Sequence, residues 1–273
     1  MIEVAPALQT IALLGAVMFC IGVVVGFIGA GGAGIAVSIL TAVFALPVHT
    51  AIGTAILGMF FVTISGAVSH YREGNVAPKL GIVVGLSGAF GAVLGADSSQ
   101  AIPDRTLAIA AGLALWALAF LVWLRTRLRL EVVSDADWHG EPARSIREWG
   151  AGGSLGALGG VAAAFFGVGM APFLQLGFLV VHRLPLRLAI GTTMLALVSI
   201  SGAGGLAMAR HGDVSLVHLA GLTIGLASGA FVGARFTRRA LGPHAGDLRH
   251  AGASRRRAAA RGAAARRRSA AAG

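Results

Sequence analysis

Charged residues are scarce in this chain of 273 residues. Asp, Glu, Lys and Arg together make up 12% of the sequence, against roughly 25% in soluble domains. None of the four occurs in residues 4–69, a run of 66 residues that is about three times the length a helix needs to cross a bilayer. The composition therefore excludes a water-soluble globular protein, a disordered chain and binding of nucleic acid by the body of the protein.

Cysteine and catalytic constellations are nearly absent as well. Cys20 is the single cysteine and lies in an apolar run, which excludes an intrachain disulfide and argues against a cysteine-based metal site. No two histidines have zinc-protease spacing, and no nucleophile stands with a base and an orienting group. Gly29-x-Gly31-x-x-Gly34 matches a dinucleotide-binding fingerprint, but a helix-length apolar run precedes it and the next acid is Glu73. The sequence predicts no enzyme, no cofactor and no metal site.

Apolar runs, in contrast, are abundant: 56% of the residues are hydrophobic and the mean hydropathy is +0.81. Seven segments are long enough to cross a bilayer, namely Leu8–Ile28, Thr50–Ser69, Leu80–Ala96, Thr106–Leu124, Gly150–Phe166, Ala189–Ala209 and Ser215–Ala234. Two shorter apolar pieces, Ile35–Leu46 and Met170–Val181, each follow a glycine cluster. The predicted fold class is all-α, a polytopic integral membrane protein with short helices interrupted by glycine.

An internal repeat divides the chain into two similar halves. Ala51-Ile52-Gly53-Thr54 realigns with Ala189-Ile190-Gly191-Thr192, and Gly74-Asn75-Val76 realigns with Gly212-Asp213-Val214 at the same spacing. We call this spacing, from position 51 to position 189, the repeat offset. At nearly the same offset, residues 85–90 match residues 225–231 and residues 29–31 match residues 167–169. Four ordered matches of this kind predict two homologous helical repeats.

The predicted organisation has four parts. Residues 1–124 form the first transmembrane repeat, and residues 125–148 form a solvated linker with five Arg and five acidic residues. Residues 149–241 form the second repeat, which lacks the last span. Residues 242–273 form an Arg/Ala-rich tail that holds eight Arg and one Asp, so it carries +7 of the total charge of +11. The composition of the tail predicts disorder and excludes a membrane span, because arginine in hydrocarbon is costly.

Basic residues also predict the orientation. Arg125, Arg127 and Arg129 directly follow a span, so the positive-inside rule places the linker in the cytoplasm. The loop with Arg72 and Lys79 would share that side, and residues 29–50 would face outward. Three further predicted spans follow the linker, so the Arg-rich tail would lie outside the cell. The positive-inside rule predicts the opposite side for such a basic segment. This conflict favours a damaged chain end, produced by a frameshift, over a polybasic segment that binds lipid.

The glycine clusters mark the candidate site. Paired, short, glycine-interrupted segments at corresponding places in two halves are the best sequence pointer to a transporter's binding site. Free backbone amides at the start of such helices suit an anion without a fixed positive charge. Gln175 is the single amide side chain in the short pieces, and two threonines follow the repeated Ala-Ile-Gly. The predicted substrate-binding residues are Gly31, Gly32, Gly34, Thr54, Gly169, Pro172, Gln175 and Thr192.

These repeated motifs resemble the sulfite exporter TauE/SafE family of membrane transporters, over about residues 8–241. The resemblance rests on residues 26–34, 51–54, 74–76 and 85–96, with a second copy at 167–172, 189–193, 212–214 and 225–234. It implies a multi-span inner-membrane permease that moves small anions such as sulfite, sulfonates or related organic anions. The expected partners are the lipid bilayer and a small anionic substrate, and no nucleic acid. The alternative is a truncated or frameshifted remnant of such a transporter, nonfunctional or regulatory.

Overall fold

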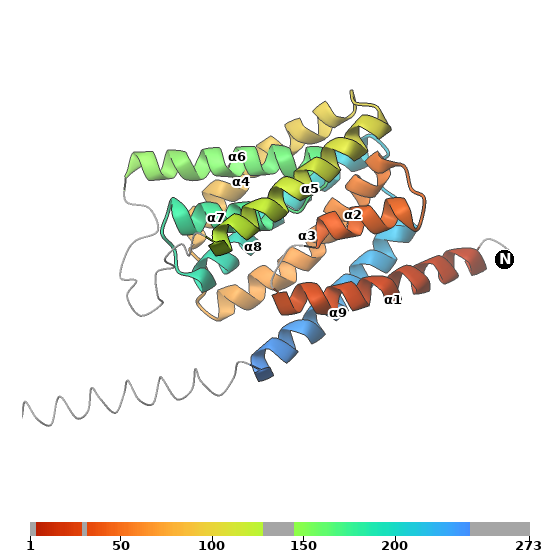
Figure 1. Ribbon diagram of the computed structural model, residues 1–273, viewed down its shortest axis with the longest axis horizontal. Helices are drawn as coiled ribbons and strands as arrows, with labels where there is room; N and C mark the ends of the chain where they lie inside the picture. The colour runs from red at the N-terminus through yellow and green to blue at the C-terminus, as the bar shows by residue number, and fades with distance from the viewer. Residues whose placement is uncertain (1–3, 29–31, 128–144, 241–273) are drawn as a thin grey trace, which may run out of the picture.

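The computed structural model describes residues 4–28, 32–127 and 145–240, and all regular structure in these ranges is helical (Figure 1). The first half contains α1 (Val4–Ile28), α2 (Ala33–Ala42), α3 (Val48–Arg72), α4 (Pro78–Ser99) and α5 (Asp104–Arg127). The second half contains α6 (Ile146–Phe166), α7 (Ala171–Val180), α8 (Leu186–Arg210) and α9 (Leu216–Ala240). The all-α prediction is confirmed.

Five of these helices, α3, α4, α5, α6 and α8, are long and apolar enough to cross a membrane. The other two predicted spans correspond to α1 and α9, whose described apolar stretches are the shorter Leu8–Val24 and Leu216–Val232, so their crossing stays a prediction. The two short pieces form α2 and α7, helices of 10 residues each. A helix of that length rises about 15 Å, half the thickness of the hydrocarbon core.

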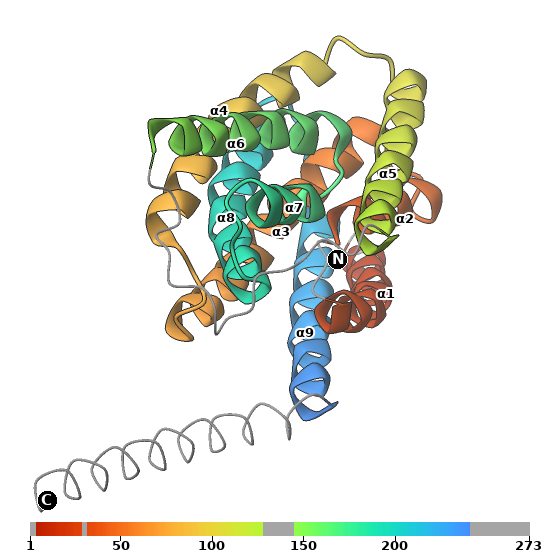
Figure 2. The same cartoon turned by 60° about the vertical axis from the view of Figure 1, so that its left-hand side comes forward.

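The helices are arranged as a central group between two close pairs. Figure 2 shows α3, α7 and α8 in the middle, with α4 and α6 on one side and α1 and α9 on the other. Glycine permits the close approach within both pairs: a Cβ added at Gly160 would overlap the carbonyl oxygen of Gly88, and one added at Gly225 would overlap that of Gly15. Helix α5 lies on the outside and is the least buried of the five candidate spans.

The bundle has two polar ends of different charge. At the acidic end, defined by Asp97, Asp104 and Asp213 with Arg105 and Arg210, α4 and α8 finish and α3, α5 and α9 begin. At the opposite, basic end, α3 finishes and α4 and α8 begin. Among the described residues of this end, one exposed acid, Glu73, stands against six exposed basic side chains. Those six are Arg72, Lys79, Arg127, Arg147, Arg183 and Arg187.

Helices α6 and α7 form a hairpin that enters and leaves at the basic end. Nε2 of His182, just after α7, lies 3.2 Å from the carbonyl oxygen of Glu148 in the first turn of α6. After this hairpin, α8 runs to the acidic end and α9 runs back, so α9 finishes on the side where the linker begins and ends (Figure 1).

This path corrects the sequence-based count of crossings. The count of three net crossings after the linker is wrong, because the α6–α7 hairpin adds no net crossing, so α9 finishes at the basic end. The tail itself, residues 242–273, and most of the linker lie outside the described residues, as does the place where a last span of the second half would stand.

Candidate functional site

The repeated Ala-Ile-Gly-Thr motif holds the two halves together at both ends of the bundle. At the basic end, the backbone N–H of Ala77 donates to Oγ1 of Thr192 over 3.0 Å. At the acidic end, the backbone N–H of Ser215 donates to Oγ1 of Thr54, also over 3.0 Å. Ala77 and Ser215 immediately precede Pro78 and Leu216, the first residues of α4 and α9. Each threonine hydroxyl therefore satisfies an amide at a helix start in the other half of the chain.

The glycines of the motif allow this contact. A Cβ at Gly53 would overlap the carbonyl oxygen of Asp213, and a Cβ at Gly191 would overlap that of Asn75. Any larger residue would push the loop away and stretch the threonine hydrogen bond beside it. The same Gly-Thr pair thus makes the same contact twice, once in each copy of the motif.

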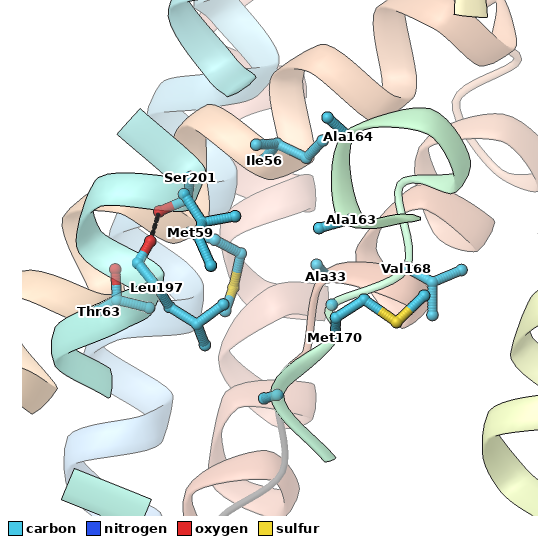
Figure 3. Close-up of a pocket in the computed structure, with 13 residues that line it drawn as sticks. Ala33, Ile56, Met59, Thr63, Ala163, Ala164, Val168, Met170, Leu197 and Ser201 are labelled. Carbon is cyan, nitrogen blue, oxygen red and sulfur yellow. Dashed lines mark hydrogen bonds between the residues drawn. The ribbon is translucent and has the colours of Figure 1, made fainter. Parts of the chain in front are cut away.

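A small cavity lies beside α3 and α8, next to the end of α6 and the starts of α2 and α7 (Figure 3). Its volume is about 30 Å³, enough for about one or two water molecules. Helices α3 and α8 contribute three residues each, the starts of the two short helices contribute Ala33 and Ala171, and the rest come from the end of α6 and the turn after it. The lining residues are Ala33, Ile56, Met59, Thr63, Ala163, Ala164, Val168, Gly169, Met170, Ala171, Leu197, Ile200 and Ser201.

The lining of this cavity is neutral and mostly apolar. Its polar side chains are the hydroxyls of Thr63 and Ser201, which donate to the carbonyl oxygens of Phe60 and Leu197 in their own helices. Both residues are buried. None of the lining residues carries a formal charge.

The starts of the two short helices meet beside the cavity. A Cβ at Gly169 would lie 3.1 Å from the Cβ of Ala33, the first residue of α2. Neither N-cap residue, Gly32 or Met170, makes a side-chain cap hydrogen bond. The first amides of a helix have no partner within the helix, and together with the helix dipole they favour an anion. Pro172, in the first turn of α7, removes one of these donors without straining the helix.

The structure brings some of the predicted site residues together and separates others. Gly169 lines the cavity, Gly32 is the buried N-cap of α2, and Gly31 lies outside the described residues. Gly34 is buried in the first turn of α2 and lines a second cavity of about 130 Å³ against α5. The side chain of Gln175 is 7% exposed, and its Nε2 has no hydrogen-bond partner.

Thr54 and Thr192 do not line the first cavity, the one that Thr63 and Ser201 line and that we call the central cavity. They lie instead toward opposite ends of the bundle. Their part in substrate binding stays a prediction, whereas their contact with the helix starts is observed. Thr63 and Ser201 do line the central cavity, although they are not among the substrate-binding residues predicted from the sequence motifs. They are separated by the repeat offset, so applying that offset to every polar residue in the spans could have found them.

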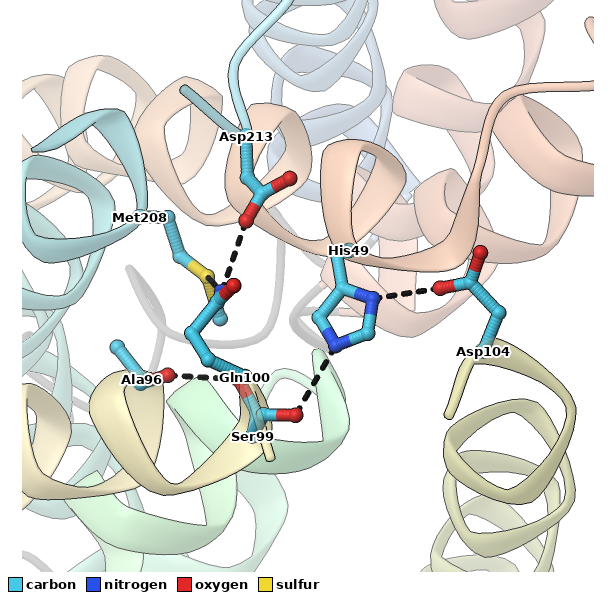
Figure 4. Close-up of polar contacts among 7 residues, drawn as sticks. All are labelled: His49, Ala96, Ser99, Gln100, Asp104, Met208 and Asp213. Atoms are coloured by element: carbon cyan, nitrogen blue, oxygen red, sulfur yellow. Dashed lines mark hydrogen bonds and ion pairs between the residues drawn. The ribbon is translucent and has the colours of Figure 1, made fainter. Parts of the chain in front are cut away.

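A network of polar side chains lies at the acidic end (Figure 4). Nδ1 of His49 lies 2.5 Å from Oδ1 of Asp104, and its Nε2 lies 3.0 Å from the carbonyl oxygen of Ser99. Nε2 of Gln100 donates to Oδ2 of Asp213 over 2.8 Å. These contacts join the start of α3 to the α4–α5 corner, and that corner to the turn between α8 and α9.

Comparison with known proteins identifies the family. The model of the family described as "Sulfite exporter TauE/SafE" matches residues 14–247, most of the chain. The chain belongs to the TauE/SafE family. A "Probable membrane transporter protein YdhB" of Bacillus subtilis is 38% identical over 221 residues, 81% of this chain and 88% of that protein. A "Probable membrane transporter protein" of Xylella fastidiosa is 29% identical over 192 residues, 70% of this chain and 71% of that protein.

No solved structure matches the chain. TauE/SafE membership makes the chain a multi-pass membrane transporter and not an enzyme. The helical bundle agrees with this identity, because the exposed surface of α5 and its neighbours is rich in large apolar side chains that suit contact with lipid, such as Leu113, Trp116 and Phe120.

Proposed function

We propose that this TauE/SafE protein is an inner-membrane permease for small anions, among them sulfite, sulfonates or related organic anions, and that the anion binds beside the meeting starts of α2 and α7. The observation that carries the proposal is the neutral cavity where these two helix starts meet. Helix starts supply partial positive charge without a side-chain cation, which lets an anion bind and leave again. The membrane potential adds about 2.3 kcal/mol per charge per 100 mV in favour of anion export from a negative interior.

We further propose that residues 1–124 and 149–241 are homologous repeats with inverted orientation. The paired contacts of Thr54 and Thr192 support this relation, since their partners Ser215 and Ala77 are also separated by the repeat offset. The opposite directions of α1 and α6 support inversion. Helix α1 begins beside the start of α9, where Ile11 contacts Gly221, and thus at the acidic end, whereas α6 begins at the basic end.

The basic end faces the cytoplasm in this proposal. Its six exposed basic residues contrast with the two of the acidic end, which is the asymmetry that the positive-inside rule associates with the cytoplasmic side. The Arg-rich segment that follows Ala240 then begins on the cytoplasmic side. The conflict that favoured a damaged chain end is thereby removed, and the remnant hypothesis rests on the composition of the tail and on the missing last span of the second half.

The experiment is flux of sulfite and of a sulfonate in proteoliposomes containing the purified chain. The Gly169→Leu variant should lose transport by at least about fivefold, because overpacking the point where the two helix starts touch costs about 1–3 kcal/mol. Gly153→Leu is the matched control, since an added Cβ there meets no atom within 4 Å. Gly31→Leu tests the corresponding place in the first half. Unchanged flux in the Gly169 and Gly31 variants would contradict this site.

A further inference from the structure

Three pairs of residues that line the central cavity are related by the repeat offset, with one member of each pair in each half of the chain. Met59 and Thr63 of α3 line the cavity, and so do Leu197 and Ser201 of the neighbouring helix α8 (Figure 3). The members of each pair stand about one helical turn apart, and the repeat offset relates one pair to the other. Ala33 and Ala171, related by the same offset, line the cavity at the starts of α2 and α7. The two hydroxyls are therefore related in the same way as the two structural threonines of the repeat.

The hydrogen bonds of these hydroxyls leave them able to bind a ligand. Oγ1 of Thr63 donates to Phe60 and Oγ of Ser201 donates to Leu197, so each hydroxyl is satisfied within its own helix when the cavity holds no substrate. Rotation of the side chain can redirect each O–H into the cavity, because a hydroxyl has one freely turning donor. Two such donors on facing helices suit a ligand with several anionic oxygens. A cation gains little here, since no carboxylate lines the cavity.

We propose that Thr63 and Ser201 are the side chains that recognise the oxyanion, donating one hydrogen bond each to the oxygens of sulfite or of a sulfonate head group. This inference rests on the proposed function and adds the residues that determine specificity. The cavity of about 30 Å³ is too small for such a group, since it holds about one or two water molecules. Binding therefore requires the starts of α2 and α7 to move apart.

The test compares hydroxyl-deleted variants with hydroxyl-retaining ones. Thr63→Val, Ser201→Ala and the double variant remove the donors, while Thr63→Ser and Ser201→Thr keep them. Ser228→Ala is the matched control, because the Ser228 hydroxyl also donates within its own helix, to Ile224, but lies on α9 away from the cavity. The readouts are the KM for sulfite in proteoliposomes and the shift in thermal unfolding that sulfite produces in detergent.

Each deletion should raise KM at least about tenfold, as expected for a lost hydrogen bond to a charged group, and should reduce the thermal shift. The hydroxyl-retaining variants should stay within about twofold of the wild type, and Ser228→Ala should not change. A double variant that folds and has the KM and the thermal shift of the wild type overturns the inference. That result differs from failure of the proposed function, in which the wild type itself moves neither sulfite nor sulfonate.

Discussion

Removing the hydroxyl of Thr192 should destabilise the contact between the two halves of the bundle. In the Thr192→Val variant the shape of the side chain is kept, but the backbone N–H of Ala77 loses the acceptor 3.0 Å away. Ala77 is 4% exposed and Thr192 is fully buried, so neither water nor a neighbouring side chain replaces the bond without movement. The N–H is then left buried and unsatisfied at the start of α4.

The expected loss follows from this burial. A buried donor left without a partner costs about 1–3 kcal/mol, and the upper half of that range applies because the site is enclosed. Thr54→Val should cost less, since its donor, the N–H of Ser215, is only partly buried. The double variant should lose the sum of the two effects, because the two bonds share no partner and lie toward opposite ends of the bundle.

The assay is equilibrium unfolding in detergent, followed by circular dichroism. Thr192→Ser keeps the hydroxyl and should recover most of the stability. Thr41→Val is the matched control, because the Thr41 hydroxyl donates within its own helix to Val37. Equal unfolding free energies for Thr192→Val and Thr41→Val would refute the reasoning, since they would show that the bond between the halves carries no stability.

Three further predictions concern pH, packing and orientation. Burial lowers the pKa of the His182 imidazole, so the ring is neutral in the folded protein. The contribution of the neutral ring to stability is complete above about pH 6.5. This contribution is lost as the pH falls through the lowered pKa. The thermal midpoint of the wild type should therefore fall more between pH 7 and pH 5 than that of His182→Gln, and equal slopes would contradict this. Gly160→Leu should destabilise the α4–α6 pair by about 3 kcal/mol in the same unfolding assay, because its side chain would enter the backbone of α4. A wild-type unfolding midpoint would be inconsistent with the packing. In a Cys20→Ser background, a membrane-impermeant thiol reagent added to intact cells should label Ser98→Cys at the acidic end and not Ser145→Cys at the basic end, and the reverse labelling would invert the orientation.

Hydropathy predicted the helices because the membrane imposes a length on apolar segments. The two short pieces, expected at Ile35–Leu46 and Met170–Val181, form α2 and α7 within a few residues of those bounds. Hydropathy did not predict that α7 returns to the end at which α6 begins, since the proximity of His182 and Glu148 is a tertiary contact. That contact changes the side on which α9 finishes.

The candidate site was predictable in part. The glycine clusters marked the starts of α2 and α7, because glycine is required where two backbones approach closely. The role of Thr54 was hidden, since its partner Ser215 is 161 residues away in the sequence. Thr63 carries no local motif at all, and only its place on the cavity beside its counterpart Ser201 distinguishes it from other hydroxyls in the spans.

The most direct test of the account is the flux of radiolabelled sulfite from proteoliposomes under an imposed membrane potential, measured for the wild type and Gly169→Leu. The account predicts flux that follows the potential as expected for a moving anion and that falls at least about fivefold in the variant, because the two helix starts beside the cavity are disturbed. Equal flux in both proteins, at equal amounts of folded protein, would contradict an anion pathway between α2 and α7.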